Sequence, residues 1–218
     1  MNKKAVVFDM DGVLIDSEAL YQYYLVDFFY RQNQNVSKED LYSFIGSSDD
    51  YFWSHMGEIW NPTLTPKEMK NLYEENNQHE PVDYKDLLNP HVGFVLRKLK
   101  EKGISIAIAS SSPLNEIQRM VQKNEIEAYF DVLVSGDDVL HCKPSPDIYK
   151  LTLNQLNVMP RDCIVVEDSY VGICASKEAG IFTIAKREYR FSINQELADI
   201  VVDDFLSIYS EIMKHFGY

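Results

Sequence analysis

The chain has 218 residues, a length that fits one domain or one domain with a sizeable insertion. Its 34 acidic and 21 basic residues give a net charge of −13, which argues against nucleic acid or anionic membrane as a partner, because both attract basic surfaces. No apolar run approaches the roughly 20 residues that span a bilayer, and the first apolar run is too short for a secretory signal. Three cysteines without a C-x-x-C pair lead us to expect a cytoplasmic protein with reduced thiols.

Six short apolar runs rich in β-branched residues predict buried strands. They span residues 5–8, 104–109, 132–134, 164–166, 182–185 and 200–202. Continuous apolar runs are typical of strands that are covered on both faces. Helical patterns alternate with the strands from residue 92 onward, and Ser112-Pro113 and Ser145-Pro146 each predict an N-cap followed by proline in the first turn. This alternation predicts an α/β fold with a doubly wound parallel sheet.

Residues 16–87 interrupt the alternation with helices alone. Helical patterns cover 17–33, 37–45, 48–58 and 65–78, the last of which opens with the capping box Thr65-Pro66-Lys67-Glu68. This segment leaves and rejoins the sheet near the carboxyl end of the first strand, and ligands of open α/β sheets bind at that edge. We therefore predict an α-helical cap domain inserted into a core of residues 1–15 and 88–218. The alternative is a helical insertion that does not cover a site.

Polar clusters follow four of the predicted strands, and in a parallel sheet these positions meet at one edge. The clusters bring together Lys143, the hydroxyl of Ser110 and the carboxylates of Asp9, Asp11, Glu167 and Asp168. Carboxylates this close repel one another unless a hard cation such as Mg²⁺ joins them. A metal ion, an ammonium group and a hydroxyl together form a receptor for phosphate. One carboxylate can then act as nucleophile, while a second one two residues later performs acid–base work.

These clusters resemble the four signature motifs of the haloacid dehalogenase superfamily. The matching segments are FDMDGVLIDS at 8–17, IAS at 108–110, KPSPD at 143–147 and VEDSYVG at 166–172. The helical insertion between the first and second motifs is similar to the branch of β-phosphoglucomutase-like phosphatases. The resemblance covers essentially the whole chain and implies a Rossmann-like core with a helical cap.

The resemblance also implies roles for the clustered residues. Asp9 would be the nucleophile and Asp11 the general acid and base. Ser110 and Lys143 would bind the transferring phosphoryl group, and Ser111 competes with Ser110 for this role. A Mg²⁺ cofactor would be held by Asp9, Asp168 and the Asp11 backbone carbonyl, with Glu167 binding it directly or through water.

Cap residues bear on the choice between a phosphatase and a phosphosugar mutase. A mutase of this branch needs a cation in the cap for the second phosphate of its bisphosphate intermediate. The cap loop carries Asp49 where the mutase pattern has an arginine, and Tyr21 stands where the mutase has a histidine. We expect the cap to bind a neutral body whose hydroxyls donate to Asp49 or Asp50. The candidate residues for substrate selection are Tyr21, Gly46, Asp49 and Asp50.

These observations predict a Mg²⁺-dependent phosphatase that hydrolyses a small phosphomonoester, such as a sugar or polyol monophosphate, through an aspartyl-phosphate on Asp9. The alternative is a β-phosphoglucomutase-type mutase. A non-catalytic sensor or interaction protein is a third hypothesis, which the intact set of motif residues argues against. We expect a small-molecule partner, neither nucleic acid nor membrane, and a monomer or weak dimer.

Overall fold

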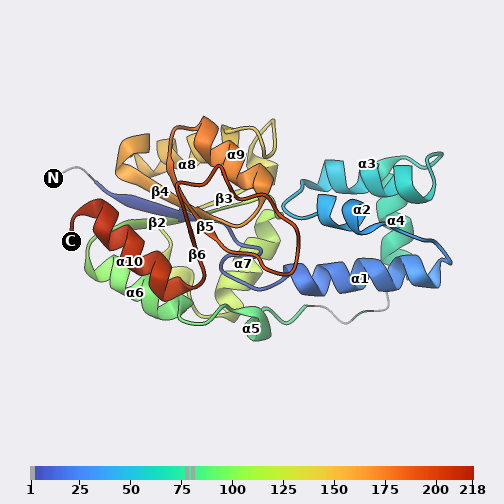
Figure 1. Ribbon diagram of the computed structural model, residues 1–218, viewed down its shortest axis with the longest axis horizontal. Coiled ribbons are helices and arrows are strands. Elements are labelled where there is room, and N and C mark those ends of the chain that lie inside the picture. The colour runs from blue at the N-terminus through green and yellow to red at the C-terminus, as the bar shows by residue number, and fades with distance from the viewer. Residues whose placement is uncertain (1–2, 77–78, 80–81) are drawn as a thin grey trace.

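The computed structural model describes residues 3–76, 79 and 82–218. Its centre is a parallel six-stranded sheet with the order β3-β2-β1-β4-β5-β6 (Figure 1). The strands are β1 (Ala5–Phe8), β2 (Ser105–Ser110), β3 (Val132–Ser135), β4 (Cys163–Glu167), β5 (Phe182–Lys186) and β6 (Ile200–Val202). All six lie close to their predicted bounds, and the predicted α/β fold with a doubly wound parallel sheet is confirmed.

Helices cover both faces of this sheet. The core helices are α5 (Tyr84–Leu87), α6 (Val92–Glu101), α7 (Leu114–Lys123), α8 (Asp147–Leu156), α9 (Tyr170–Glu178) and α10 (Phe205–Phe216). Short 3-10 turns lie at η1 (Glu127–Tyr129), η2 (Gly136–Asp138) and η3 (Pro160–Asp162). None of the helices among the described residues is long and apolar enough to cross a membrane.

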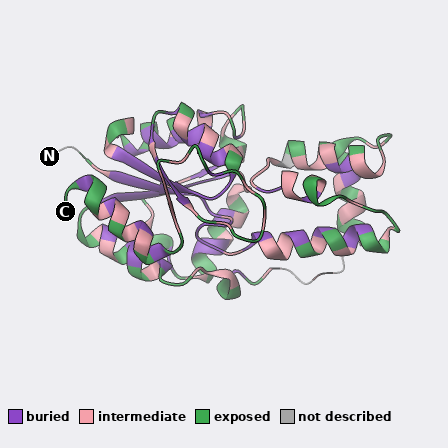
Figure 2. Ribbon diagram, in the orientation of Figure 1, coloured by how far each residue is buried: buried purple, intermediate pink, exposed green. Residues whose placement is uncertain are grey.

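The alternation of side chains along β1 explains why both faces are covered. Val6 and Phe8 pack into one apolar cluster with α6, α7 and α10, whereas Ala5 and Val7 pack into a second cluster with α8 and α9. All four side chains are fully buried, as expected for a central strand whose successive residues point to opposite faces. Figure 2 shows the buried residues concentrated along the strands.

The four cap helices lie beyond the carboxyl ends of the strands (Figure 1). They are α1 (Glu18–Arg31), α2 (Lys38–Ser43), α3 (Asp49–Trp60) and α4 (Pro66–Asn76). They share an apolar cluster of their own, built from Leu25, Phe28, Phe29, Leu41, Phe44, Met56 and Met69. The predicted capping box of α4 forms, because the Thr65 backbone N–H donates to Glu68 Oε2 at 2.9 Å and the Glu68 N–H donates to Thr65 Oγ1 at 3.3 Å.

Two chain segments connect core and cap, and backbone hydrogen bonds join them. Asp16 N–H donates to the Leu87 carbonyl at 2.7 Å, and Asn89 N–H donates to the Leu14 carbonyl at 2.9 Å. Val82, Tyr84 and Leu87 pack against the larger cluster of the core rather than against the cap helices. We therefore propose that the cap ends before Val82, earlier than the boundary at residue 87 that the sequence suggested.

The two predicted serine caps are wrong by one residue. Helices α7 and α8 begin after Pro113 and Pro146, which occupy the N-cap positions themselves. The Ser112 hydroxyl instead donates to Asp11 Oδ2 at 2.7 Å. An N-cap hydroxyl accepts from backbone N–H groups, whereas here the Ser112 hydroxyl donates to a carboxylate in a charge-assisted hydrogen bond.

Candidate active site

The carboxyl ends of β1, β2 and β4 place three of the predicted site residues side by side. Phe8 pairs with Ile108 on one side and with Val166 on the other, so the residues that follow these positions are neighbours. Asp9 comes directly after β1, and its backbone N–H donates to the Val166 carbonyl at 2.9 Å. Ser110 ends β2 and Glu167 ends β4. The parallel register thus gathers residues that lie far apart in the sequence.

Lys143 is buried at this edge between two carboxylates. Its ammonium donates to Asp9 Oδ1 at 2.6 Å, to Glu167 Oε1 at 2.7 Å and to the Ala109 carbonyl at 3.2 Å. Burial alone would lower the pKa of Lys143, but the adjacent carboxylates of Asp9 and Glu167 raise it well above its usual value. Lys143 is therefore a fixed positive charge beside Asp9.

The ionised form of Asp9 is disfavoured by its surroundings unless positive charge lies nearby. Burial raises the pKa of Asp9 to about 8, the Lys143 ammonium opposes that rise, and the carboxylates of Glu167 and Asp11 add to it. One lysine thus offsets only part of the negative charge crowded at this edge. A second cation at the site would remove the remaining penalty.

The Glu167 carboxylate is saturated by protein donors. Oε1 accepts from Lys143 and from the Tyr149 hydroxyl at 3.2 Å. Oε2 accepts from the backbone N–H groups of Asp168 at 2.8 Å and Ser169 at 2.9 Å, and from the Ser169 hydroxyl at 3.0 Å. Five donors surround the two oxygens of this carboxylate. We therefore propose that Glu167 positions Lys143, whereas the sequence suggested that Glu167 binds the metal ion.

Asp168 has the features of a metal ligand. Its Oδ2 atom is buried and has no hydrogen-bond partner among the described residues. A Cβ atom at Gly12 would lie 2.0 Å from this oxygen, so only glycine leaves space for it. Burial, followed by the charges of Glu167, Glu18 and Asp9, raises the pKa of the Asp168 carboxyl well above its usual range.

The donors present fit a Mg²⁺ ion. Within the described ranges, no group of three or more His, Cys, Asp or Glu side chains is arranged to hold a metal. The implied set needs only two carboxylates, Asp9 and Asp168, together with the backbone carbonyl of Asp11. Mg²⁺ favours such oxygen ligands and completes its octahedron with water or phosphate oxygens.

Asp11 is held by hydroxyl groups from two different segments. Ser17, the N-cap residue of α1, donates to Asp11 Oδ1 at 2.6 Å, and Ser112 donates to Oδ2 at 2.7 Å. Burial raises the pKa of Asp11, and these two hydrogen bonds act in the opposite direction. A raised pKa favours the protonated form of the carboxyl group, which is the form that a general acid needs.

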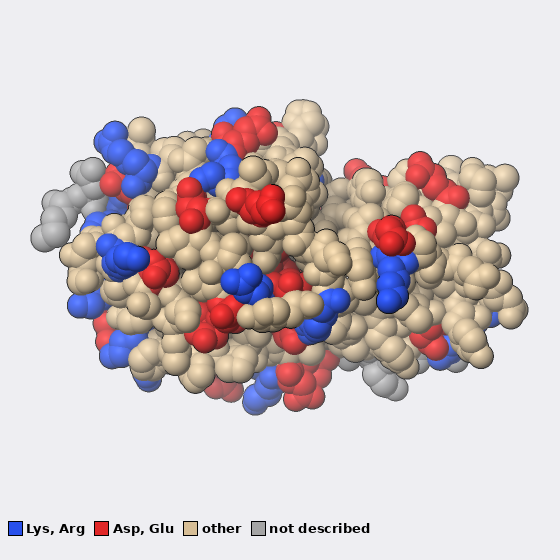
Figure 3. Space-filling model, viewed as in Figure 1, with Lys and Arg blue, Asp and Glu red and all other residues tan. Residues whose placement is uncertain are grey.

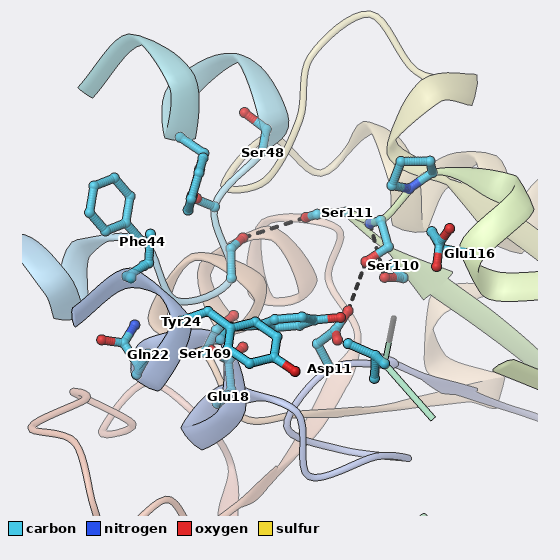
Figure 4. Close-up of a pocket in the computed structure, with 18 of the residues that line it drawn as sticks. Asp11, Glu18, Gln22, Tyr24, Phe44, Ser48, Ser110, Ser111, Glu116 and Ser169 are labelled. Carbon is cyan, nitrogen blue, oxygen red and sulfur yellow. Dashed lines mark hydrogen bonds between the residues drawn. The ribbon is translucent and has the colours of Figure 1, made fainter. Parts of the chain in front are cut away.

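Ser110 and Ser111 both border the cavity above this edge. The Ser110 hydroxyl oxygen accepts from the Ser112 backbone N–H at 3.1 Å, which keeps it at the end of β2. The Ser111 hydroxyl instead reaches the cap, where it donates to the Gly46 carbonyl at 3.4 Å (Figure 4). We therefore propose Ser110 as the phosphate-binding hydroxyl and Ser111 as a contact between core and cap.

The cavity has a volume of about 540 Å³ and lies between the sheet edge and the cap helices. Its lining includes Asp9, Asp11, Lys143 and, from the cap, the predicted residues Tyr21 and Gly46. Asp50 is exposed and does not line the cavity, and the Asp49 side chain lies outside the described part of the structure. The lining of the cavity therefore does not support the expectation that substrate hydroxyls donate to Asp50, which stays a prediction.

Other cap residues that line the cavity were not singled out from the sequence. Aromatic side chains form part of its wall, namely Tyr24, Phe44, Phe52, Trp53 and Tyr73. Glu18 and Gln22 of α1 also contribute (Figure 4). Tyr21 and Gln22 follow Glu18 by three and four residues, a spacing along one helix face that the sequence contained.

Comparisons with known proteins agree with this geometry. Residues 6–186 match the family described as haloacid dehalogenase-like hydrolase. The "phosphorylated carbohydrates phosphatase" of Thermotoga maritima is 35% identical over 183 residues, which are 82% of either chain. "Hexitol phosphatase B" of Escherichia coli is 29% identical over 83% of this chain and 82% of its own. The crystal structure of β-phosphoglucomutase from Clostridium difficile has the same fold, with a TM-score of 0.83 at 22% identity over 99% of this chain and 97% of its own. The chain therefore belongs to the haloacid dehalogenase-like hydrolases, among their phosphatases and β-phosphoglucomutase-like members with a helical cap.

Proposed function

We propose that this protein is a Mg²⁺-dependent phosphatase that hydrolyses a small phosphorylated carbohydrate, a sugar or polyol monophosphate, through an aspartyl-phosphate on Asp9. The observation that carries the proposal is the buried ion pair of Asp9 and Lys143, with Asp11 nearby, at the floor of the cavity under the cap. Two relatives whose names describe phosphatases of phosphorylated carbohydrates and hexitols support the substrate class.

The residues divide the reaction into two steps. An oxygen of Asp9 forms a bond to phosphorus while the bond from phosphorus to the substrate oxygen breaks, and Asp11 donates a proton to that leaving oxygen. Asp11 then takes a proton from a water molecule, which attacks the phosphorus and releases inorganic phosphate and the Asp9 carboxylate. Lys143 balances the charge of the phosphoryl group throughout. A bound Mg²⁺, held by Asp9, Asp168 and the Asp11 carbonyl, would supply further positive charge.

The charge of the cavity wall favours a phosphatase over a mutase. Among the described lining residues, the cap helices α1 to α4 contribute neither lysine nor arginine. Arg119 lines the cavity from α7 in the core, where it donates to Glu116 Oε1 at 3.3 Å and to the Val82 carbonyl at 3.0 Å. His79 also lines the cavity, and it lies 3.1 Å from the Asp27 carboxylate. A distal phosphate would thus lack a cap lysine or arginine to bind it.

Phosphate release from a panel of sugar and polyol monophosphates, with and without Mg²⁺, tests the proposal. We expect the wild-type protein to be active, chelation to abolish the activity, and Asp9→Asn to be inactive. Asp16→Asn is a matched control, because Asp16 lies in the same motif but pairs with Arg190 at the surface, so it should retain activity. Turnover by pure Asp9→Asn protein would refute the nucleophile. Conversion of β-glucose 1-phosphate to glucose 6-phosphate faster than phosphate release would favour the mutase.

A further inference from the structure

One face of helix α1 forms a continuous part of the cavity wall. Glu18, Tyr21, Gln22 and Leu25 all line the cavity, and their spacing of three or four residues puts them on the same side of the helix. Glu18 lies next to Ser17, which binds Asp11, so it is at the catalytic end of this face. With a rise of about 1.5 Å per residue, the face extends roughly 10 Å from the catalytic end into the cap.

Glu18 is a buried carboxyl group for which the protein provides no partner. Its residue is only 5% exposed, and it has neither a hydrogen bond nor a salt bridge with any described residue. Burial raises the pKa of Glu18 well above its usual value, and the neighbouring charges that affect this pKa most are all acidic and add to the rise. A buried carboxyl group without a partner is costly, so it is rarely kept unless a ligand completes its hydrogen bonds.

Gln22, one helical turn further along, has one half of its amide fixed and the other half unpaired. Its Nε2 donates to the Leu41 carbonyl of α2 at 2.9 Å, which orients the amide. Its Oε1 is buried and has no hydrogen-bond partner among the described residues. The helix thus carries two unpaired oxygen acceptors along one side of the cavity.

Glu116 on α7 provides an internal comparison. It also lines the cavity, but its carboxylate accepts from the Tyr84 hydroxyl at 2.6 Å and from Arg119 at 3.3 Å. This acidic residue is satisfied by the protein itself. The lack of partners is therefore not shared by every polar residue of the cavity. Among the described lining residues, the buried Nε1 of Trp53 on α3 is also unpaired, but it is a donor, so the unpaired acceptors of Glu18 and Gln22 lie together on the α1 face.

We propose that Glu18 and Gln22 bind hydroxyl groups of the substrate, so that the substrate is a polyhydroxylated phosphomonoester whose body extends along α1. This inference rests on the proposed phosphatase function. A hydroxyl donates to a carboxyl or amide oxygen, whereas an apolar body would leave both acceptors unpaired. A second anionic group would be repelled by the carboxyl groups at the catalytic end of the face.

Binding to inactive protein tests the inference independently of turnover. Calorimetry on Asp9→Asn protein would measure the affinity for sorbitol 6-phosphate and for n-hexyl phosphate, which has the same carbon chain without hydroxyls. Adding Glu18→Met should weaken sorbitol 6-phosphate binding about 30-fold, and adding Gln22→Met about 10-fold, as expected for one lost hydrogen bond to a charged or a neutral group. Binding of n-hexyl phosphate should change less than about 3-fold, because it makes neither bond.

The control and the contrary outcomes separate this inference from the proposed function. Glu116→Gln in the same background should affect both ligands equally, since its carboxylate is already paired. Equal weakening of both ligands by Glu18→Met, or no weakening of either, would overturn the inference. A further outcome is that the wild-type protein releases no phosphate while binding still prefers sorbitol 6-phosphate in a way that depends on Glu18 and Gln22. That result would uphold the inference and refute the proposed phosphatase function.

Discussion

Replacing Glu167 by glutamine would remove the acceptor on which the buried lysine depends. The carboxylate accepts five hydrogen bonds, and the amide nitrogen of glutamine can accept none. Turned one way, the amide nitrogen faces Lys143 and the Tyr149 hydroxyl. Turned the other way, it faces two backbone N–H groups. Removing one partner of a buried ion pair costs about 3–5 kcal/mol, so we expect the free energy of unfolding of Glu167→Gln to fall by about that amount.

Urea unfolding at neutral pH measures this loss, with Glu178→Gln as a control at an exposed helical position that should change stability by less than about 0.5 kcal/mol. Calorimetry with Mg²⁺ then separates structure from ligation. Asp168→Asn should weaken Mg²⁺ binding at least tenfold, whereas folded Glu167→Gln should retain most of its affinity. A loss of stability below about 1 kcal/mol, or a loss of Mg²⁺ affinity equal to that of Asp168→Asn, would refute the positioning role.

Two further predictions concern the support of the site and of the sheet. Gly12→Ala should abolish Mg²⁺ binding in calorimetry and destabilise the protein more than Gly103→Ala in unfolding. Both glycines have φ near +70°, but only a Cβ atom at Gly12 would lie against Asp168. Equal effects of the two substitutions in both measurements would contradict this prediction. Asp131 accepts from Lys100 at 2.7 Å and from the Ile106 N–H at 2.9 Å, and these hydrogen bonds lower its pKa although partial burial opposes them. A carboxyl group whose pKa is lower in the folded protein stabilises the fold at pH values above its unfolded pKa. In urea unfolding, Asp131→Asn should therefore cost about 0.5–1 kcal/mol at pH 7 and progressively less below about pH 4. A stability difference between the two proteins that stays constant with pH would contradict this role of Asp131.

Much of the fold could be predicted because its strands are central and buried. The runs 5–8 and 164–166 are apolar throughout, a pattern that is typical of strands covered on both faces. Parallel order then requires the segments after β1, β2 and β4 to meet, which brings Asp9, Ser110 and Glu167 together. These predictions depended on the apolar pattern of each local segment and on the rule that parallel strands end at the same side of the sheet.

The partners of individual side chains could not be predicted in the same way. A serine before a proline is typical of a helix cap, and nothing in the sequence indicates that Ser112 binds a carboxylate 101 positions away. Glu167 has the composition of a metal ligand, but the donors that saturate it come partly from the backbone of its own turn and partly from Tyr149 on α8. Such choices depend on tertiary geometry within an ångström, which residue type and spacing do not contain.

The separate apolar cluster of the cap has a consequence for how such enzymes diversify. Leu25, Met56 and Met69 stabilise the cap helices without contributing to the clusters that pack on the sheet. Side chains of the cap that face the cavity can therefore be exchanged while the sheet edge with Asp9 and Lys143 stays as it is. With the roles proposed above, most of the residues that select the substrate and those that react with it would lie in two separately packed parts of the chain. Substitutions in the cap could then change the substrate without changing the reacting residues.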